Sequence, residues 1–142
     1  MADIARHSVS VAAVVVDDHD RALLIRRRDN GHWEPPGGIL ELSEHITDGL
    51  RREVAEETGL QVEPSALTGV YKNMSQGIIA LVFRCHETGG RLTTASETAE
   101  VRWASRPEVA ALADQAYAIR VLDALDFAAP PAVRAHDGVR LI

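Results

Sequence analysis

The sequence predicts an α/β fold in which a mixed β-sheet lies between helices, an α/β/α sandwich. Two observations indicate this class: short runs rich in β-branched and aliphatic residues recur along the chain, and segments with apolar residues at helical spacing stand among them. A length of 142 residues is enough to bury a core, and 46% apolar with 25% charged residues is the composition of a globular protein. We therefore expect one domain over residues 1–142.

The N-terminal part of the chain is predicted to contain two strands. Residues 8–16 are rich in valine and indicate a buried strand, and a polar turn separates them from a second strand at residues 22–25. The proline-rich segment that follows cannot be a central strand, because Pro35 and Pro36 lack the N–H donors that a ladder of hydrogen bonds needs.

A helix is predicted from Ser43, a suitable N-cap, to Gly59, a suitable C-terminal cap. Three apolar residues spaced four apart would form its buried stripe: Ile46, Leu50 and Val54. Gly49 lies inside this helix, where glycine costs roughly 1 kcal/mol relative to alanine. Close approach of another backbone would explain its presence.

The rest of the chain is predicted to contain more strands and two helices. Strands are expected at residues 60–62, 67–71, 77–85, 100–105 and 139–142. A hairpin turn is expected at residues 87–91, where two glycines occur together. Helices are expected at residues 107–114 and 116–127, the second with Ile119, Leu122 and Leu125 on one stripe.

Charge and composition exclude several classes of function. A formal net charge of −6 argues against non-specific binding of nucleic acid, which needs a basic surface. It does not exclude a phosphorylated small molecule, because bound divalent cations invert the local field. Cys85 is the only cysteine, so no intrachain disulfide can form. The N-terminal apolar run is too short to span a membrane and lacks the basic start of a signal peptide, so we expect a cytoplasmic protein without a membrane partner.

Three carboxylates are placed together on the predicted helix. Glu53, Glu56 and Glu57 stand at positions i, i+3 and i+4, which share one helix face. Ligands that are all oxygen suit Mg²⁺ or Mn²⁺ and disfavour zinc. Such a metal neutralises phosphate oxygens and activates water, and a remaining glutamate can act as general base. The alternative is a solvated acidic helix with Glu–Arg pairs.

Two neighbouring features favour a metal site over a solvated helix face. Gly37 and Gly38 follow two prolines and lead into the helix, so backbone groups can reach the same metal or phosphate. Arg52 stands beside Glu53, where its charge can keep that glutamate ionised and oriented.

The segment from Gly38 to Leu60 resembles the Nudix box of Nudix hydrolases. The box is Gly, five residues, Glu, seven residues, Arg-Glu, an apolar residue, any residue, Glu-Glu, any residue, Gly and an apolar residue. Its nine specified positions are all matched here: Gly38, Glu44, Arg52, Glu53, Val54, Glu56, Glu57, Gly59 and Leu60. The resemblance implies a Nudix-type α/β/α sandwich and a pyrophosphohydrolase that uses Mg²⁺, with Mn²⁺ as the alternative.

The resemblance also implies roles for individual residues. Five residues would bind the divalent cations: the carbonyl of Gly37 and the side chains of Glu53, Glu56, Glu57 and Glu97. In many family members a glutamate several residues before a Trp on a strand completes the site; Glu97 and Glu100 both precede Trp103 here, and Glu97 is chosen. Glu53 would also serve as catalytic base, and Arg52 would orient it through an ion pair.

The family cleaves a nucleoside diphosphate linked to another group. Ser75 stands where members acting on ADP-ribose often carry proline, and Gly77 stands where members acting on dinucleoside polyphosphates often carry tyrosine. These differences favour a nucleoside triphosphate or a modified nucleotide. Candidate substrate contacts are Arg26, Arg28, Lys72 and Arg84, with Arg26 preferred because in the family's topology it faces the Gly37 loop. Trp33 is expected to pack rather than to stack on a base.

Two alternative functions and one alternative state of assembly are also considered. A Nudix-fold sensor would bind a nucleotide without cleaving it, but such regulators often have an incomplete box. An isomerase of isoprenoid diphosphates would need additional cysteine and glutamate chemistry, for which Cys85 alone is weak support. We expect a small-molecule nucleotide as partner, no nucleic acid, and a homodimer as the alternative to a monomer, since family members often pair.

Overall fold

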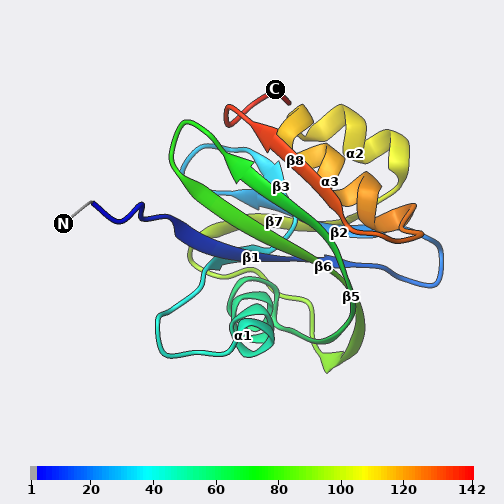
Figure 1. Cartoon of the computed structure of the whole chain (residues 1–142). Helices are drawn as coiled ribbons and strands as arrows, with labels where there is room; N and C mark the ends of the chain where they lie inside the picture. The colour runs from blue at the N-terminus through cyan, green and yellow to red at the C-terminus, as the bar shows by residue number, and fades with distance from the viewer. Residues whose placement is uncertain (1–2) are drawn as a thin grey trace.

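The computed structural model describes residues 3–142, and over this range the chain forms eight strands and three helices (Figure 1). The strands are β1 (Ser8–Val15), β2 (Ala22–Arg27), β3 (Trp33–Glu34), β4 (Gly37–Ile39), β5 (Leu60–Asn73), β6 (Ile78–Gly90), β7 (Thr98–Ala104) and β8 (Ala132–His136). The helices are α1 (Ile46–Thr58), α2 (Arg106–Leu112) and α3 (Gln115–Leu125). No helix within residues 3–142 combines the length and the apolar composition needed to cross a membrane.

The strands form two sheets that lie between the helices. One sheet has five strands in the order β4-β1-β6-β5-β8, and the other has three in the order β3-β2-β7. The pairs β1–β6 and β5–β8 are parallel and the other pairs are antiparallel. Helix α1 covers one side of this layer, and α2 and α3 cover the other (Figure 1). The predicted α/β/α sandwich with a mixed sheet is confirmed.

Strand β1 is buried on both faces, which explains its continuous run of apolar residues. Val11 and Val15 belong to the core cluster that contains Leu50 of α1. Val14 points the other way, into the cluster that contains Val121 of α3. Because alternate side chains of a strand face opposite sides, β1 joins the two halves of the core.

Helix α1 begins at Ile46 with His45 as its N-cap, so the predicted start at Ser43 was wrong. Ser43 lies in a preceding turn that Glu44 stabilises: the Glu44 carboxylate accepts a hydrogen bond from the N–H of Glu41 at 2.9 Å. Ile46 is 43% exposed because it stands at the first turn of the helix, beyond the edge of the core. The buried stripe therefore consists of Leu50 and Val54 without it.

Two glycines of α1 have a structural reason. Gly59 ends the helix with φ of 79°, in the left-handed region that favours glycine, as predicted. Gly49 is buried, and a Cβ there would lie 2.5 Å from Leu40 Cδ1 and 2.8 Å from Glu44 Oε1. The close approach expected at Gly49 is thus made by side chains rather than by another backbone.

The C-terminal elements depart from the sequence prediction in three ways. Strands β5 and β6 form one long hairpin whose turn is at residues 74–77, so the turn predicted at residues 87–91 was wrong. Register shifts in β5, including one between Pro64 and Ala66, let proline remain in the strand. The last strand is β8 rather than residues 139–142. In α3 the fully buried stripe includes the small residues Ala118 and Ala124, which let the helix approach the sheet closely, whereas Ile119 and Leu122 are partly buried.

Candidate active site

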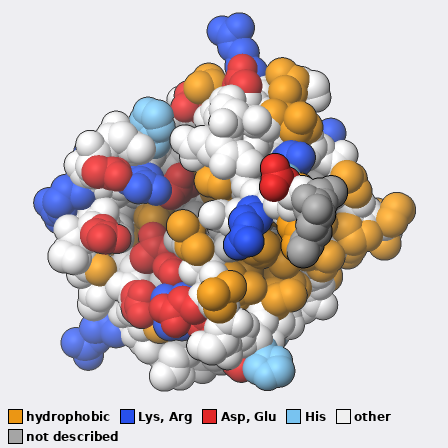
Figure 2. All heavy atoms as spheres, turned by 60° about the vertical axis from the view of Figure 1, so that its left-hand side comes forward, with side chains coloured by type: hydrophobic (Ala, Val, Ile, Leu, Met, Phe, Trp, Pro, Cys, Tyr) orange, Lys and Arg blue, Asp and Glu red, His pale blue; other side chains and the backbone are white. Residues whose placement is uncertain are grey.

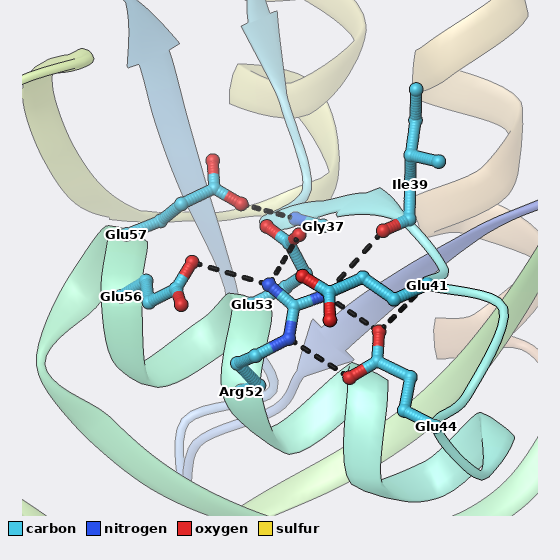
Figure 3. Close-up of polar contacts among 8 residues, drawn as sticks. All are labelled: Gly37, Ile39, Glu41, Glu44, Arg52, Glu53, Glu56 and Glu57. Carbon is cyan, nitrogen blue, oxygen red and sulfur yellow. Dashed lines mark hydrogen bonds and ion pairs between the residues drawn. The ribbon is translucent and has the colours of Figure 1, made fainter.

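The C-terminal end of α1 lies against β4, and this contact brings the box glutamates to the glycine strand. The N–H of Gly37 donates a hydrogen bond to Glu57 Oε1 at 2.9 Å (Figure 3). Gly38 is just as close to the helix, since a Cβ there would lie 2.5 Å from the Glu53 carboxylate. Glycine at position 38 therefore leaves the space that Glu53 occupies.

Arg52 is the centre of the polar network in Figure 3. Its Nε and Nη2 donate to the two oxygens of Glu44 at 2.9 and 2.6 Å. Its Nη1 donates to Glu53 at 3.0 Å and to Glu56 at 3.3 Å. The two bonds to Glu44 orient the plane of the guanidinium, and the guanidinium in turn orients Glu53.

The carboxylates of this cluster differ in their pKa values because their surroundings differ. Burial raises the pKa of Glu57 to about 8, and the neighbouring charges of Glu53 and Glu34 act in the same direction. Burial also raises the pKa of Glu53, against the lowering effect of Arg52. The hydrogen bonds from Arg52 lower the pKa of Glu44 to about 2. Burial thus disfavours the ionised forms of Glu53 and Glu57, whereas the hydrogen bonds from Arg52 favour the ionised form of Glu44.

The donor set fits a hard divalent cation. Its side chains offer only carboxylate oxygens, which Mg²⁺ and Mn²⁺ prefer, and the raised pKa values of Glu53 and Glu57 indicate that a further cation would stabilise their ionised forms. Within residues 3–142 no three acidic, histidine or cysteine side chains are already gathered in metal-binding geometry. Instead, Glu56 accepts a hydrogen bond from Arg52, and Glu57 accepts one from the N–H of Gly37.

A cavity of about 600 Å³ opens beside Glu53 and Glu57, which are both partly buried. Its lining includes Gly37, Gly38, Glu53, Glu57 and Glu97. Glu100 instead lies 3.6 Å from Arg26 in an ion pair and does not line this cavity. Glu97 and Glu100 were both candidates from the sequence, and of these two Glu97 lines the cavity beside Glu53 and Glu57.

The basic candidates are distributed unevenly around this cavity. Arg28 lines it and donates to the carbonyls of Ser96 and Thr98 at 3.0 and 3.2 Å. Lys72 does not line the cavity, and Arg84 donates to carbonyls at the C-terminal end of α3. Acidic and basic side chains are also mixed on the face shown in Figure 2.

Arg26, which was expected to face the Gly37 loop, lines neither of the two cavities that Gly37 lines. Its guanidinium carbon lies 6.0 Å from the ring centre of Trp33, and its charge pairs with Glu100. Trp33 is partly buried against the core, in agreement with a packing role.

Arg27 was missed by the sequence analysis, although it lines this cavity and a second one beyond β4. The pairing of β2 with β7 shifts register between Arg26 and Arg27. Such an irregularity breaks the simple alternation of side chains, so the faces of three consecutive arginines could not be assigned from spacing. Glu34, Tyr117 and Arg120 of the second cavity carried no signal in the sequence beyond their residue types.

Comparison with known proteins identifies the family and supports the fold. The NUDIX domain family model matches residues 6–125. A "MutT-like protein" from Streptomyces ambofaciens is 57% identical over 136 residues, which cover 96% of this chain and 88% of that protein. The human "8-oxo-dGDP phosphatase NUDT18" is 39% identical over 90 residues, which cover 61% of this chain but only 28% of the human protein. A crystal structure of a NUDIX hydrolase from Nitrosomonas europaea has a TM-score of 0.80 at 21% identity and covers 94% of this chain and 82% of that one, which shows a shared fold.

The chain belongs to the Nudix family and is a Nudix pyrophosphohydrolase. Members of this family generally use divalent metal ions.

Proposed function

We propose that the protein hydrolyses a phosphoanhydride bond in a nucleoside diphosphate linked to another group, with a nucleoside triphosphate or a modified nucleotide as the favoured substrate. The observation that carries this proposal is the pair Glu53 and Glu57, both with raised pKa values, at a cavity that also holds Arg27 and Arg28. Hydrolysis of a phosphoanhydride needs carboxylates that bind a divalent cation and positively charged groups that bind phosphate. The two glutamates and the two arginines at this cavity supply both. The name of the human relative specifies 8-oxo-dGDP, a modified nucleotide, which supports the substrate class.

Mg²⁺ is the proposed metal, with Mn²⁺ as the alternative. Glu53, Glu56, Glu57, Glu97 and the carbonyl of Gly37 would hold it, and when bound it would neutralise phosphate oxygens and acidify water. Binding would exchange the present hydrogen bond of Glu57 to Gly37 for contacts to the cation.

Glu53 is the proposed general base. It would take the proton of the attacking water, and its hydrogen bond from Arg52 would keep the carboxylate oriented for this transfer. Burial raises the pKa of Glu53, which makes it a stronger base than an exposed glutamate.

Arg28 and Arg27 are the proposed phosphate contacts of the box cavity. Both present planar guanidinium groups, which pair with phosphate oxygens in two-point contacts. Arg26 and Lys72 remain weaker candidates, since neither lines this cavity.

A substrate panel tests the proposal. Purified protein with Mg²⁺ is incubated with nucleoside triphosphates, oxidised nucleotides, nucleotide sugars, ADP-ribose and dinucleoside polyphosphates, and the products are separated by chromatography. Glu53→Gln should lose about 10²–10⁴-fold in kcat. Asp48→Asn, the matched change on an exposed part of α1, should keep wild-type activity. Binding of a nucleotide without cleavage of any would favour the sensor alternative instead.

Four further proposals concern the whole chain. Residues 1–142 form one domain, since β8 pairs with β5 although the family match ends at residue 125. Limited proteolysis should therefore leave one resistant core.

The protein is cytoplasmic, which cell fractionation tests. It does not bind nucleic acid, in line with its net charge of −6. A homodimer is the proposed assembly, and light scattering measures its mass.

A further inference from the structure

Arg120 of α3 is a buried cation without an adequate acceptor. Its side chain belongs to a residue that is only 7% exposed, and its Nε has no hydrogen-bond partner among the described residues. Its Nη2 lies 3.0 Å from His136 Nε2, but the other ring nitrogen of His136 already accepts from the N–H of Gly138 at 2.9 Å. A neutral imidazole accepts at only one nitrogen, so one of these two donors lacks an acceptor.

Two tyrosines fix the position of this guanidinium. Its carbon lies 4.7 Å from the ring centre of Tyr117 and 5.3 Å from that of Tyr71. The Tyr71 hydroxyl donates to Asp123 at 2.7 Å, which holds that ring in place. Arg120 is therefore pre-positioned, and a buried donor held without an acceptor is a site for a ligand acceptor.

Arg120 lines the second cavity, which has a volume of about 240 Å³. Tyr117 and Glu34 line the same cavity, and the Glu34 side chain is 16% exposed and accepts from Arg27 Nη1 at 3.4 Å through one of its two oxygens. Gly37 and Gly38 line both this cavity and the larger one beside Glu53. A substrate with its phosphates at the box can thus extend past these glycines toward Arg120.

The chemistry of the two charged side chains selects what could bind. Arginine pairs with the O6 and N7 acceptors of guanine, and a carboxylate accepts from adjacent N–H groups such as N1–H and the 2-amino group of the same base. Adenine offers the same N7 acceptor but presents an amino donor in place of O6. One N–H of Arg120 would then face another donor, and both would stay unpaired, which is a basis for rejection. Uracil offers one N–H between two carbonyls and so gives the carboxylate a single donor.

We propose that Arg120 and Glu34 are specificity-determining residues that read a guanine base in the second cavity. This inference rests on the proposed function, because it places the phosphates of the same nucleotide at the box. Arg120 supplies donors to O6 and N7, Glu34 accepts from the opposite edge of the ring, and Tyr117 borders the site.

Binding of nucleoside monophosphates tests this without any turnover. Calorimetry compares GMP, AMP and UMP with metal-free wild type, Glu34→Gln, Arg120→Lys and the control Arg102→Lys, whose arginine pairs with Glu108 and lines neither cavity. Wild type and the control should bind GMP about tenfold or more tightly than AMP and UMP. Glu34→Gln and Arg120→Lys should reduce that ratio to near one. Thermal unfolding shows whether each variant is folded. If Arg120→Lys does not fold, Glu34→Gln alone still tests the inference.

The outcomes separate this inference from the proposed function. Equal binding of the three nucleotides, preference for AMP or UMP, no binding at all, or a GMP preference that survives Glu34→Gln would overturn the inference, even if the hydrolysis panel succeeds. A GMP preference that Glu34→Gln abolishes would uphold the inference, even if no nucleotide is cleaved.

Discussion

Glu57, on the last turn of α1, accepts a hydrogen bond at 2.9 Å from the backbone N–H of Gly37, a residue twenty positions earlier on β4. This contact joins the helix to the strand and withdraws the carboxylate from water. The fold therefore holds a proton-binding group at the place where the proposed metal is expected, and the stability of the metal-free protein should depend on pH.

The free energy of unfolding should fall as the pH rises from about 5 to 8. The pKa of Glu57 is raised from 4.5 to about 8, so between these values the native state binds more protons than the unfolded chain. Stability then decreases with pH, by at most about 1.4 kcal/mol per pH unit for this group. Urea unfolding at several pH values measures the slope, and Glu57→Gln should flatten it. An equal slope in both proteins would show that another group is responsible.

Mg²⁺ should stabilise the protein more at pH 8 than at pH 6. A metal ligand must be deprotonated, so the cation competes with the proton that Glu57 binds. Thermal unfolding with and without Mg²⁺ at the two pH values gives the difference, which should shrink in Glu57→Gln. If Mg²⁺ raises the unfolding temperature equally at both values, the ligand role of Glu57 is wrong.

Arg52→Lys should lower kcat by about tenfold with little change in KM. Lysine is a point charge and cannot bond both oxygens of Glu44 while also orienting Glu53, as the guanidinium does. Arg51→Lys is the control, since Arg51 pairs with Asp48 and Glu63 on the exposed side of the helix. Steady-state kinetics of both variants make the comparison. Loss of activity in both would point to a general effect on α1.

Gly38→Ala and Gly37→Ala should fail in different ways. At position 38 the new Cβ meets the movable carboxylate of Glu53 at 2.5 Å, so kcat should fall about 10²-fold while stability changes little. At position 37 it meets the backbone of β1, 2.2 Å from the Val11 oxygen, and the variant should lose about 1–3 kcal/mol of stability. Chemical denaturation and kinetics on each variant distinguish the two effects. The same loss of stability in both would refute the assignment for Gly38.

Arg28→Gln should raise KM about tenfold, whereas Lys72→Gln should leave it within about twofold, because only Arg28 lines the box cavity. Saturation kinetics with the substrate that the panel identifies measure both. A larger effect at Lys72 would mean that the nucleotide follows a different path across the protein.

The sequence by itself determined the elements and residues whose physics is local. Glu53, Glu56 and Glu57 share a face because of helical spacing alone, and Gly59 ends that helix because its φ of 79° favours glycine. The sequence also predicted that β1 is a buried strand, because every residue from Val11 to Val15 is apolar.

The tertiary structure decided everything that depends on how distant segments meet. Register against β2 pairs Glu100 with Arg26 and leaves Glu97 at the cavity, and a register shift next to Arg26 brings Arg27 into the site. Residues 87–90 pair with β5 as part of the long strand β6, so the hairpin turn lies at residues 74–77 rather than at residues 87–91. The contact between Glu57 and Gly37, and the meeting of Arg120 with Glu34 around one cavity, have no local signature either. Spacing along a helix or strand is a property of neighbouring residues, whereas pairing register and the burial of charge are properties of the assembled chain.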